Sequence, residues 1–236
     1  MRVYALSDLH LSFQSDKPMN VFGERWDNYE EKIRANWNKI VTSEDVVVIA
    51  GDISWAMQIE NTKKDFEYID SLNGKKVIVR GNHDFWWKTI SKVREIVPSS
   101  ISVLQNDAIK IGNLIFCGTR GWLVPERGKP LGEQDQKIYD RELIRLEMAL
   151  VSANKLKENE DNKIIVVLHY PPFNSDIDEN EFTALLEKYN IKIVVYGHLH
   201  GKTKYKCNNQ EKNGIKYYLS SCDKVNFSPI LILDND

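Results

Sequence analysis

The sequence Val46-Val47-Val48-Ile49-Ala50-Gly51-Asp52 is a continuous apolar run that ends in a glycine and a carboxylate. A run of this kind predicts a strand that is buried on both faces, in a sheet covered by helices. Asp52 would then lie at the carboxyl end of the strand, where α/β folds build their binding and catalytic sites.

The same arrangement recurs along the chain, with a short apolar run followed closely by a polar motif. The other runs are Val3–Leu6, Val77–Val79, Ile164–Leu168 and Ile191–Tyr196. The motifs after them are Asp8-Leu9-His10, Gly81-Asn82-His83-Asp84, His169 and Gly197-His198-Leu199-His200, which together contain all five histidines of the chain. The strands are therefore predicted to bring carboxylate, amide and imidazole groups to the same kind of place.

The segments between and after these runs indicate the fold class. Helix-like stretches of mixed charge lie at Tyr29–Thr42, Asn61–Leu72, Asp135–Glu158 and Glu179–Tyr189. Other segments look antiparallel: Ala108–Ile111 and Leu114–Cys117 flank a predicted hairpin turn, and Lys216–Ser220 and Ile230–Leu233 predict two more strands. Parallel strands with helices, followed by strands in pairs, indicate an α/β fold of two packed sheets with helices outside.

Composition limits the possible functions. The 236 residues, 42% hydrophobic and 28% charged, suit a single globular domain over residues 1–236. The formal net charge of −2 argues against a protein that coats itself with nucleic acid. The three cysteines form no Cys-x-x-Cys pair, and we find neither a signal peptide nor a membrane span. We therefore expect a cytoplasmic protein.

Several motif residues are suited to hold metal ions. Asp8 and His10 are two apart, which at the end of a strand puts both side chains on one face. Asp52 is a natural bridging carboxylate, because the preceding glycine lets the backbone approach a crowded site. His198 and His200 again lie two apart. Each motif alone has an ordinary alternative, such as a polar turn or a helix cap, but together they predict a site for two metals.

The donor atoms of the motif residues indicate which metals the site could hold. The amide of Asn82 can ligate a hard cation without adding charge, and the imidazole of His83 can serve as a general acid. A mixed nitrogen and oxygen donor set without thiolate suits Mn²⁺, Fe, Co²⁺ or Zn²⁺ and disfavours copper or a dedicated calcium site. We expect two divalent metal ions and favour manganese.

The order Asp-x-His, Gly-Asp, Gly-Asn-His-Asp, His, Gly-His-x-His resembles that of the calcineurin-like metallophosphoesterase superfamily, in particular its predicted bacterial phosphohydrolases. The resemblance implies a four-layer α/β/β/α sandwich of two mixed sheets flanked by helices. It implies one metal held by Asp8, His10, Asp52 and His200, and a second held by Asp52, Asn82, His169 and His198. It also implies that His83 is a catalytic residue that stabilises or protonates the departing alkoxide, with Asp84 as a candidate to orient it.

The function implied by the resemblance is phosphoester hydrolysis, by in-line attack of a hydroxide that bridges two metals. Protein Ser/Thr phosphatases are expected to continue Gly-Asp with Val-Asp-Arg-Gly and to have Gly-Asn-His-Glu, whereas this chain has Ile53-Ser54-Trp55-Ala56 and Asp84. A protein phosphatase is therefore disfavoured. The resemblance to predicted bacterial phosphohydrolases, together with the aromatic and arginine residues described below, favours a small phosphodiester or nucleotide as substrate.

Three alternatives stay open: a metal-dependent nuclease, a phosphomonoesterase and a non-catalytic protein-binding scaffold. A nucleic-acid substrate is possible but not favoured, because the chain has no extended basic block. A scaffold is disfavoured because every expected ligand is present. The sequence does not indicate the oligomeric state.

Arg120, Trp122 and Tyr170 are candidate substrate contacts. Aromatic side chains near the motifs could stack on a base or aryl group, although packing of the motif loops explains them equally simply. Arg120 and Arg127 could clasp a second phosphate, and an ordinary salt bridge is the alternative for both. Lys202, Lys204 and Lys206 could put positive charge near the site or could belong to a solvated edge strand.

Overall fold

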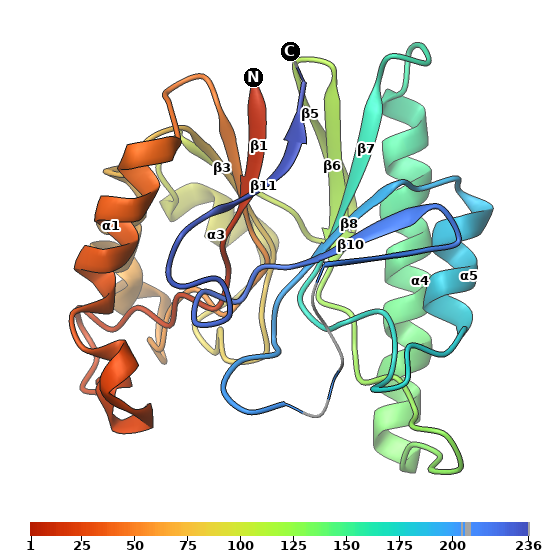
Figure 1. The fold of residues 1–236 in the computed structure, drawn as a ribbon, viewed down its shortest axis with the longest axis horizontal. Helices are drawn as coiled ribbons and strands as arrows, with labels where there is room; N and C mark the ends of the chain where they lie inside the picture. Colours follow the sequence, from red (N-terminus) through yellow and green to blue (C-terminus); the bar gives the residue numbers. More distant parts are fainter. Residues whose placement is uncertain (204, 206–208, 236) are drawn as a thin grey trace.

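The computed structural model of the chain describes residues 1–203, 205 and 209–235. Two sheets pack face to face and helices cover their outer faces, so the layers run helix, sheet, sheet, helix (Figure 1). The predicted α/β/β/α sandwich of two mixed sheets is confirmed. Lys204 and Lys206, two of the alternating lysines, lie outside the described residues.

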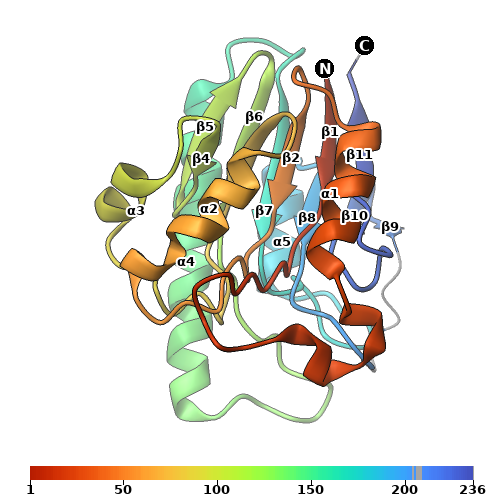
Figure 2. The ribbon, with the colours of Figure 1, turned by 90° about the vertical axis from the view of Figure 1, so that its left-hand side faces the viewer.

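The first sheet has the strand order β11-β1-β2-β3-β4. The strands β1 (Arg2–Ala5), β2 (Val46–Ile49), β3 (Lys75–Ile78) and β4 (Ile101–Val103) are parallel, and β11 (Ile230–Asp234) is antiparallel to β1. Its outer face is covered by α1 (Tyr29–Ile40), α2 (Lys63–Asp70) and α3 (Ile90–Ile96), as Figure 2 shows. Short 3-10 helices η1 (Met19–Phe22) and η2 (Glu24–Trp26) lie before α1, and η3 (Ile59–Thr62) lies before α2.

The second sheet has the strand order β5-β6-β7-β8-β10-β9. The predicted hairpin is confirmed as β5 (Asp107–Ile111) and β6 (Leu114–Thr119), which pair antiparallel. The strands β7 (Lys163–Leu168), β8 (Ile193–Tyr196) and β10 (Ile215–Leu219) continue parallel to β6, and β9 (Gln210–Lys212) closes the sheet antiparallel to β10. The helices α4 (Glu133–Leu156) and α5 (Glu181–Lys188) cover the outer face (Figure 1).

The end of the chain differs from the sequence-based expectation. The last two strands were expected in the antiparallel part of the fold, but β10 runs parallel to β8 and only β11 is antiparallel, to β1. They therefore belong to different sheets: β10 lies between β8 and β9 in the second sheet, and β11 lies at the edge of the first. The elements α3, β4 and β9 were not predicted, since segments of three to seven residues carry too little periodicity.

Burial on both sides explains the continuous apolar runs of the strands. Along β2, Val46 and Val48 lie in the core between the two sheets, whereas Val47 and Ile49 pack against the helices. Because successive side chains point to opposite faces of a strand, both faces must be apolar. Because the central strands of each sheet are parallel, their carboxyl ends lie at the same edge of that sheet.

The longest helix, α4, has 24 residues and packs its small and apolar side chains Leu146, Ala149, Leu150 and Ala153 into the fold. Its outer face carries charged residues together with a few exposed apolar side chains, of which Ile144 is the most exposed. Across the described part of the chain, no helix is both long enough and apolar enough to span a membrane.

The core between the sheets can be tested at Phe116, a fully buried residue of β6. Phe116→Ala should lower the free energy of unfolding by about 3–5 kcal/mol, because it removes apolar contacts and leaves a cavity. Ile144→Ala is the control: this side chain is 63% exposed on α4, and its loss should change stability by less than about 0.5 kcal/mol. Urea unfolding followed by circular dichroism gives both values. Equal losses in the two variants would contradict the assignment of this core.

Candidate metal centre

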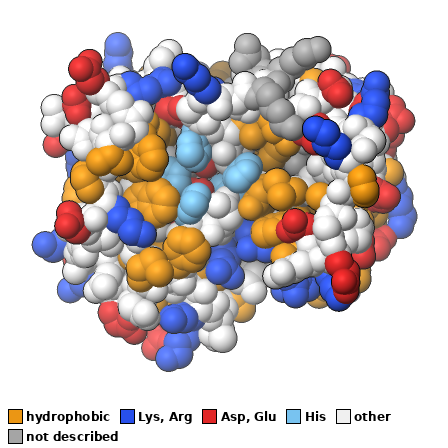
Figure 3. All heavy atoms as spheres, turned by 90° about the horizontal axis from the view of Figure 1, so that it is seen from below, with side chains coloured by type: hydrophobic (Ala, Val, Ile, Leu, Met, Phe, Trp, Pro, Cys, Tyr) orange, Lys and Arg blue, Asp and Glu red, His pale blue; other side chains and the backbone are white. Residues whose placement is uncertain are grey.

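The polar motifs meet at the edge of the molecule where the parallel strands end. The motifs after β1, β2 and β3 come from the first sheet, and those after β7 and β8 come from the second. Figure 3 views this edge and shows histidine side chains gathered in a hollow, with hydrophobic side chains around them and Lys and Arg side chains nearby. The site therefore belongs to both sheets.

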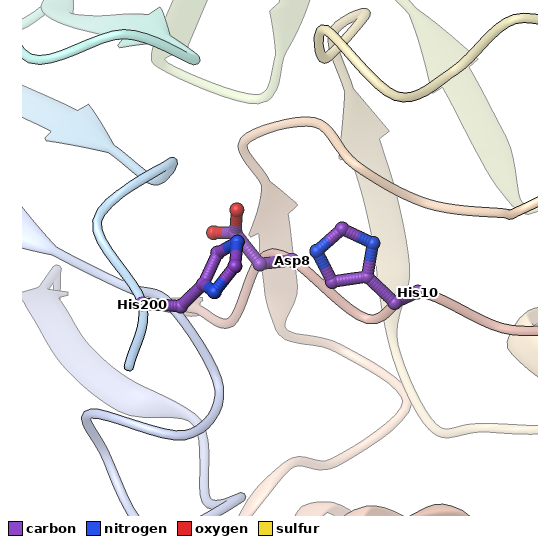
Figure 4. A group of neighbouring side chains, drawn as sticks. All are labelled: Asp8, His10 and His200. Carbon is purple, nitrogen blue, oxygen red and sulfur yellow. The ribbon is translucent and has the colours of Figure 1, made fainter. Parts of the chain in front are cut away.

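The first group of candidate ligands is Asp8, His10 and His200; Figure 4 shows Asp8 and His10 on one loop and His200 on another. Each offers a ligand atom, and these atoms all lie within 4.8 Å of one another. Asp8 and His10 are buried, whereas His200 is partly exposed. This group matches three of the four residues that the sequence assigns to one metal.

The carboxylate of Asp8 is held by residues from the second sheet. The backbone N–H of His198 lies 3.0 and 3.1 Å from its two oxygens, and the Ser221 hydroxyl donates to Oδ2 at 2.8 Å. Without a cation, burial raises the pKa of Asp8 to about 7, with His169 opposing the shift and Asp52 adding to it. A bound cation would favour the charged carboxylate.

Asp52 lies between the two predicted groups of ligands. Its Oδ2 atom is 3.7 Å from His10 Nε2 and 3.5 Å from His169 Nε2. Its Oδ1 atom accepts a hydrogen bond from the backbone N–H of His83 at 2.8 Å. One oxygen thus faces an imidazole from each predicted metal position, which is the arrangement that a bridging carboxylate requires.

The second group gathers around the amide of Asn82. Its Oδ1 atom lies 2.6 Å from His169 Nε2 and 2.9 Å from His198 Nδ1. His169 Nδ1 lies 2.9 Å from the carbonyl oxygen of Ala50, to which it donates in the neutral ring. The lone pair of Nε2 then faces the oxygens of Asn82 and Asp52, and a cation between them would satisfy all three.

Buried atoms without partners indicate that the residues fit a metal. Both ring nitrogens of His10 and the Oδ2 atom of Asp52 are buried and make no hydrogen bond within the described residues. An unsatisfied buried polar atom costs about 1–3 kcal/mol. Burial also raises the pKa of Asp52 well above its ordinary range, and the Asp84 carboxylate raises it further. A divalent cation would offset these costs.

Four residues of the site have a left-handed backbone conformation. Asp8, His10, Asp52 and His198 have φ angles of 55°, 47°, 51° and 69°. Non-glycine residues in this left-handed region cost on the order of 1–3 kcal/mol each and cluster at active sites.

Two glycines are needed because neighbouring motifs approach them closely. A Cβ atom on Gly81 would lie 2.1 Å from Asp52 Oδ1, and one on Gly197 would lie 2.5 Å from Asp8 Oδ2. Neither carboxylate could stay in place beside a larger residue. The glycines of the Gly-Asn-His-Asp and Gly-His-x-His motifs therefore make room for carboxylates from other strands.

His83 lies beside the candidate ligands. Its ring centroid is 4.7 Å from that of Trp55 and 5.6 Å from that of His10. Partial burial lowers the pKa of His83 to about 4, and the imidazoles of His169 and His200 and the ammonium of Lys17 lower it as well. The ring is thus close to the metal centre without belonging to either of the groups described above.

Asp84 is expected to orient the His83 ring, but its carboxylate binds other groups. Its carboxylate accepts hydrogen bonds of 2.7–3.2 Å from the backbone N–H groups of Ile53, Ser54 and Gly81 and from Trp86 Nε1. The His83 ring is not among these donors, which occupy both carboxylate oxygens. The contacts join the loop that carries Asn82 to the loop that carries Asp52, so Asp84 positions the loops.

The candidate substrate contacts form a stack beside the second group. The ring centroids of Tyr170 and His198 lie 4.1 Å apart, and those of Trp122 and Tyr170 lie 5.0 Å apart. The Arg120 guanidinium lies 4.5 Å from the centroid of the Trp122 ring. Arg127 is not brought to this stack, because it forms an exposed ion pair of 2.6 Å with Asp178.

Two supporting residues were missed by sequence reasoning. Trp55 stacks on His10 at 4.7 Å with an interplanar angle of 21°, and it also contacts His83. Ser221 supports Asp8 from the end of β10. The signal for Ser221 was its position directly after a predicted strand. Trp55 lies three residues after Asp52, and no local pattern relates it to His10.

The chain is similar to known proteins in sequence and in fold. The calcineurin-like phosphoesterase family profile matches residues 1–202. An uncharacterized protein of Methanocaldococcus jannaschii is 33% identical over 86 residues, which are 35% of this chain and 47% of that relative. The match thus spans about half the length of that relative.

Two further proteins are similar over more of their length. A probable cyclic nucleotide phosphodiesterase of Vesicomyosocius okutanii subsp. Calyptogena okutanii is 24% identical over 199 residues, 74% of this chain and 76% of the relative. The crystal structure of phosphopantetheinyl hydrolase from Mycobacterium tuberculosis matches with a TM-score of 0.54 and 14% identity, covering 93% of this chain and 88% of that one. At this identity the second likeness shows the fold alone.

The family profile spans the motifs that build both groups of candidate ligands. The chain therefore belongs to the calcineurin-like phosphoesterase family and is a hydrolase that acts on phosphoester bonds.

Proposed function

We propose that this protein is a phosphodiesterase that depends on two divalent metal ions and acts on a small phosphodiester or nucleotide. The observation that carries the proposal is the position of Asp52 Oδ2, 3.7 Å from His10 Nε2 and 3.5 Å from His169 Nε2. A single carboxylate oxygen between imidazoles of two ligand groups suits two ions that share one bridge.

The ligand sets are those that the resemblance implies. Asp8, His10, Asp52 and His200 would hold one ion, and Asp52, Asn82, His169 and His198 would hold the other. When bound, the ions would act as Lewis acids and lower the pKa of a water molecule toward neutrality, so that it can attack phosphorus in line. The donor set of nitrogen and oxygen atoms suits manganese, iron, cobalt or zinc, and manganese is the ion that we propose to test first.

The protein's own residues would supply the remaining chemistry. His83 lies outside both ligand sets and, in its protonated form, would deliver a proton to the departing oxygen. Trp55 packs on both His83 and His10 and would hold the two rings in place. The stack of Tyr170 and Trp122 would contact the substrate beside the second ion.

A diester is favoured over a monoester by the similarity to a probable cyclic nucleotide phosphodiesterase. The comparison that separates the two is hydrolysis of bis-p-nitrophenyl phosphate and p-nitrophenyl phosphate by metal-stripped protein, with and without added Mn²⁺. We expect manganese-dependent cleavage that is faster for the diester. Faster cleavage of the monoester would instead establish a phosphomonoesterase, and cleavage of neither by protein with two bound metals would support a protein-binding scaffold.

Asp52→Asn tests the bridge. The change keeps the shape of the side chain but removes its negative charge, so we expect the number of tightly bound ions to fall below two. Metal content after dialysis, measured by plasma mass spectrometry, gives the result. Asp178→Asn is a matched control, because it removes a carboxylate from a surface ion pair and should leave metal content unchanged. Two tightly retained ions in Asp52→Asn would exclude it as the bridge.

His83→Ala tests the proton donor. Turnover should fall by roughly 10²–10⁴-fold, because a positioned general acid contributes about that much. Metal content and the thermal unfolding temperature should stay at their wild-type values, since the ring holds neither ion. Unchanged turnover of the diester would remove His83 from the mechanism.

A further inference from the structure

A small cavity with a strongly basic lining lies beside the metal centre, where β3, β4 and β6 end. Its volume is about 270 Å³. The charged side chains that line it, here called the basic pocket, are Arg80, Lys88, Arg120, Arg141, Arg145 and Glu142. Five cations thus face one carboxylate, in a chain whose formal net charge is −2.

The single carboxylate of the basic pocket is already engaged. Glu142 is fully buried, and its Oε1 atom lies 2.6 Å from Arg145 Nη1 and 3.9 Å from Arg120 Nη2. Its Oε2 atom accepts hydrogen bonds from the Thr119 hydroxyl at 2.6 Å and from the backbone N–H of Gly121 at 3.2 Å. Glu142 therefore cannot neutralise the other cations of the pocket.

The other cations of the pocket have N–H groups that no described residue engages. Within the described residues, no hydrogen bond or ion pair engages the side chain of Arg80, Lys88 or Arg141. The Nε atoms of Arg80 and Arg120 are buried and also make no hydrogen bond with any residue that the structure describes. Guanidinium groups in this state suit an anion with several oxygens, because each can bind two oxygens side by side.

The basic pocket adjoins the second group of candidate ligands. Arg80 directly precedes the Gly81-Asn82 segment. The carbonyl oxygen of Arg120 accepts hydrogen bonds from the backbone N–H groups of His169 and Tyr170 at 3.0 and 2.9 Å. One molecule could therefore reach both the metal centre and the pocket.

We infer that the basic pocket binds a second phosphate of the substrate, one that is not cleaved, so that the preferred substrates are phosphodiesters carrying an additional phosphate group. This inference rests on the proposed phosphodiesterase function. The cavity lies just below the range of about 300–1,000 Å³ usual for whole ligands, which suits a terminal phosphate rather than a nucleoside. A single compact pocket also differs from the extended basic stripe that a nucleic-acid backbone requires.

A binding experiment tests the pocket without catalysis. Inorganic diphosphate is titrated into metal-stripped protein by calorimetry, so that no ion at the metal centre can bind it. We expect wild-type protein to bind diphosphate and Arg141→Gln to bind it at least about ten-fold more weakly, a change of about 1.4 kcal/mol. Arg80→Gln, from another element of the pocket, should weaken binding in the same way.

The control for the binding experiment is Lys155→Gln, which removes an exposed cation from the last turn of α4, the helix that also carries Arg141. It should leave the affinity for diphosphate unchanged. The same affinity in wild-type protein, Arg80→Gln and Arg141→Gln would overturn the inference, as would the absence of binding to wild-type protein.

A kinetic experiment tests the substrate class. Thymidine 5′-(p-nitrophenyl phosphate) is compared with the same diester carrying a 3′-phosphate, in the manganese-loaded enzyme. We expect kcat/KM to be at least about ten-fold higher for the compound with the additional phosphate, and this preference to fall toward one in Arg141→Gln but not in Lys155→Gln. Equal cleavage of both diesters by wild-type enzyme would overturn the inference and leave the proposed function standing. If the enzyme cleaves neither diester but Arg141→Gln still weakens the binding of diphosphate, the proposed phosphodiesterase function is refuted and the pocket remains as an anion site.

Discussion

The carboxylate of Asp52 is buried between imidazoles from two sheets, and much of the surrounding structure serves to keep it there. Its Oδ2 atom faces His10 and His169 without any hydrogen bond from the described residues. Burial alone would favour the protonated acid, so a charged bridge requires cations on either side. The absence of a side chain at Gly81 leaves room for this carboxylate.

The two-sheet architecture makes such a centre possible. Each sheet is buried on both faces, and its parallel strands end at the same edge of the molecule (Figure 1). Ligands from different sheets can thus approach one another without either sheet having to bend. Asp84 and Ser221 stabilise the arrangement, the first by joining two loops of one sheet and the second by holding Asp8 from the other.

Two electrostatic environments lie side by side at this edge. The metal centre gathers carboxylates and neutral imidazoles, which attract cations, whereas the basic pocket gathers cations around Glu142. A phosphorylated substrate that extends from the metal centre to the basic pocket would suit both environments. The arginines of the basic pocket come from the segment after β3, the segment after β6 and the helix α4.

The sequence by itself determined most of the strands, the order of the motifs and the candidate ligands, because apolar runs and the residues that end them are local properties of the chain. Periodicity could not show which strands become neighbours, so the placement of β10 and β11 was decided only in the tertiary structure. The same holds for Ser221, which meets Asp8 across a separation of 213 positions, and for Asp84, whose partners are backbone groups. The basic pocket likewise exists only after folding, since Arg80 and Arg141 lie in separate elements and no local pattern relates them.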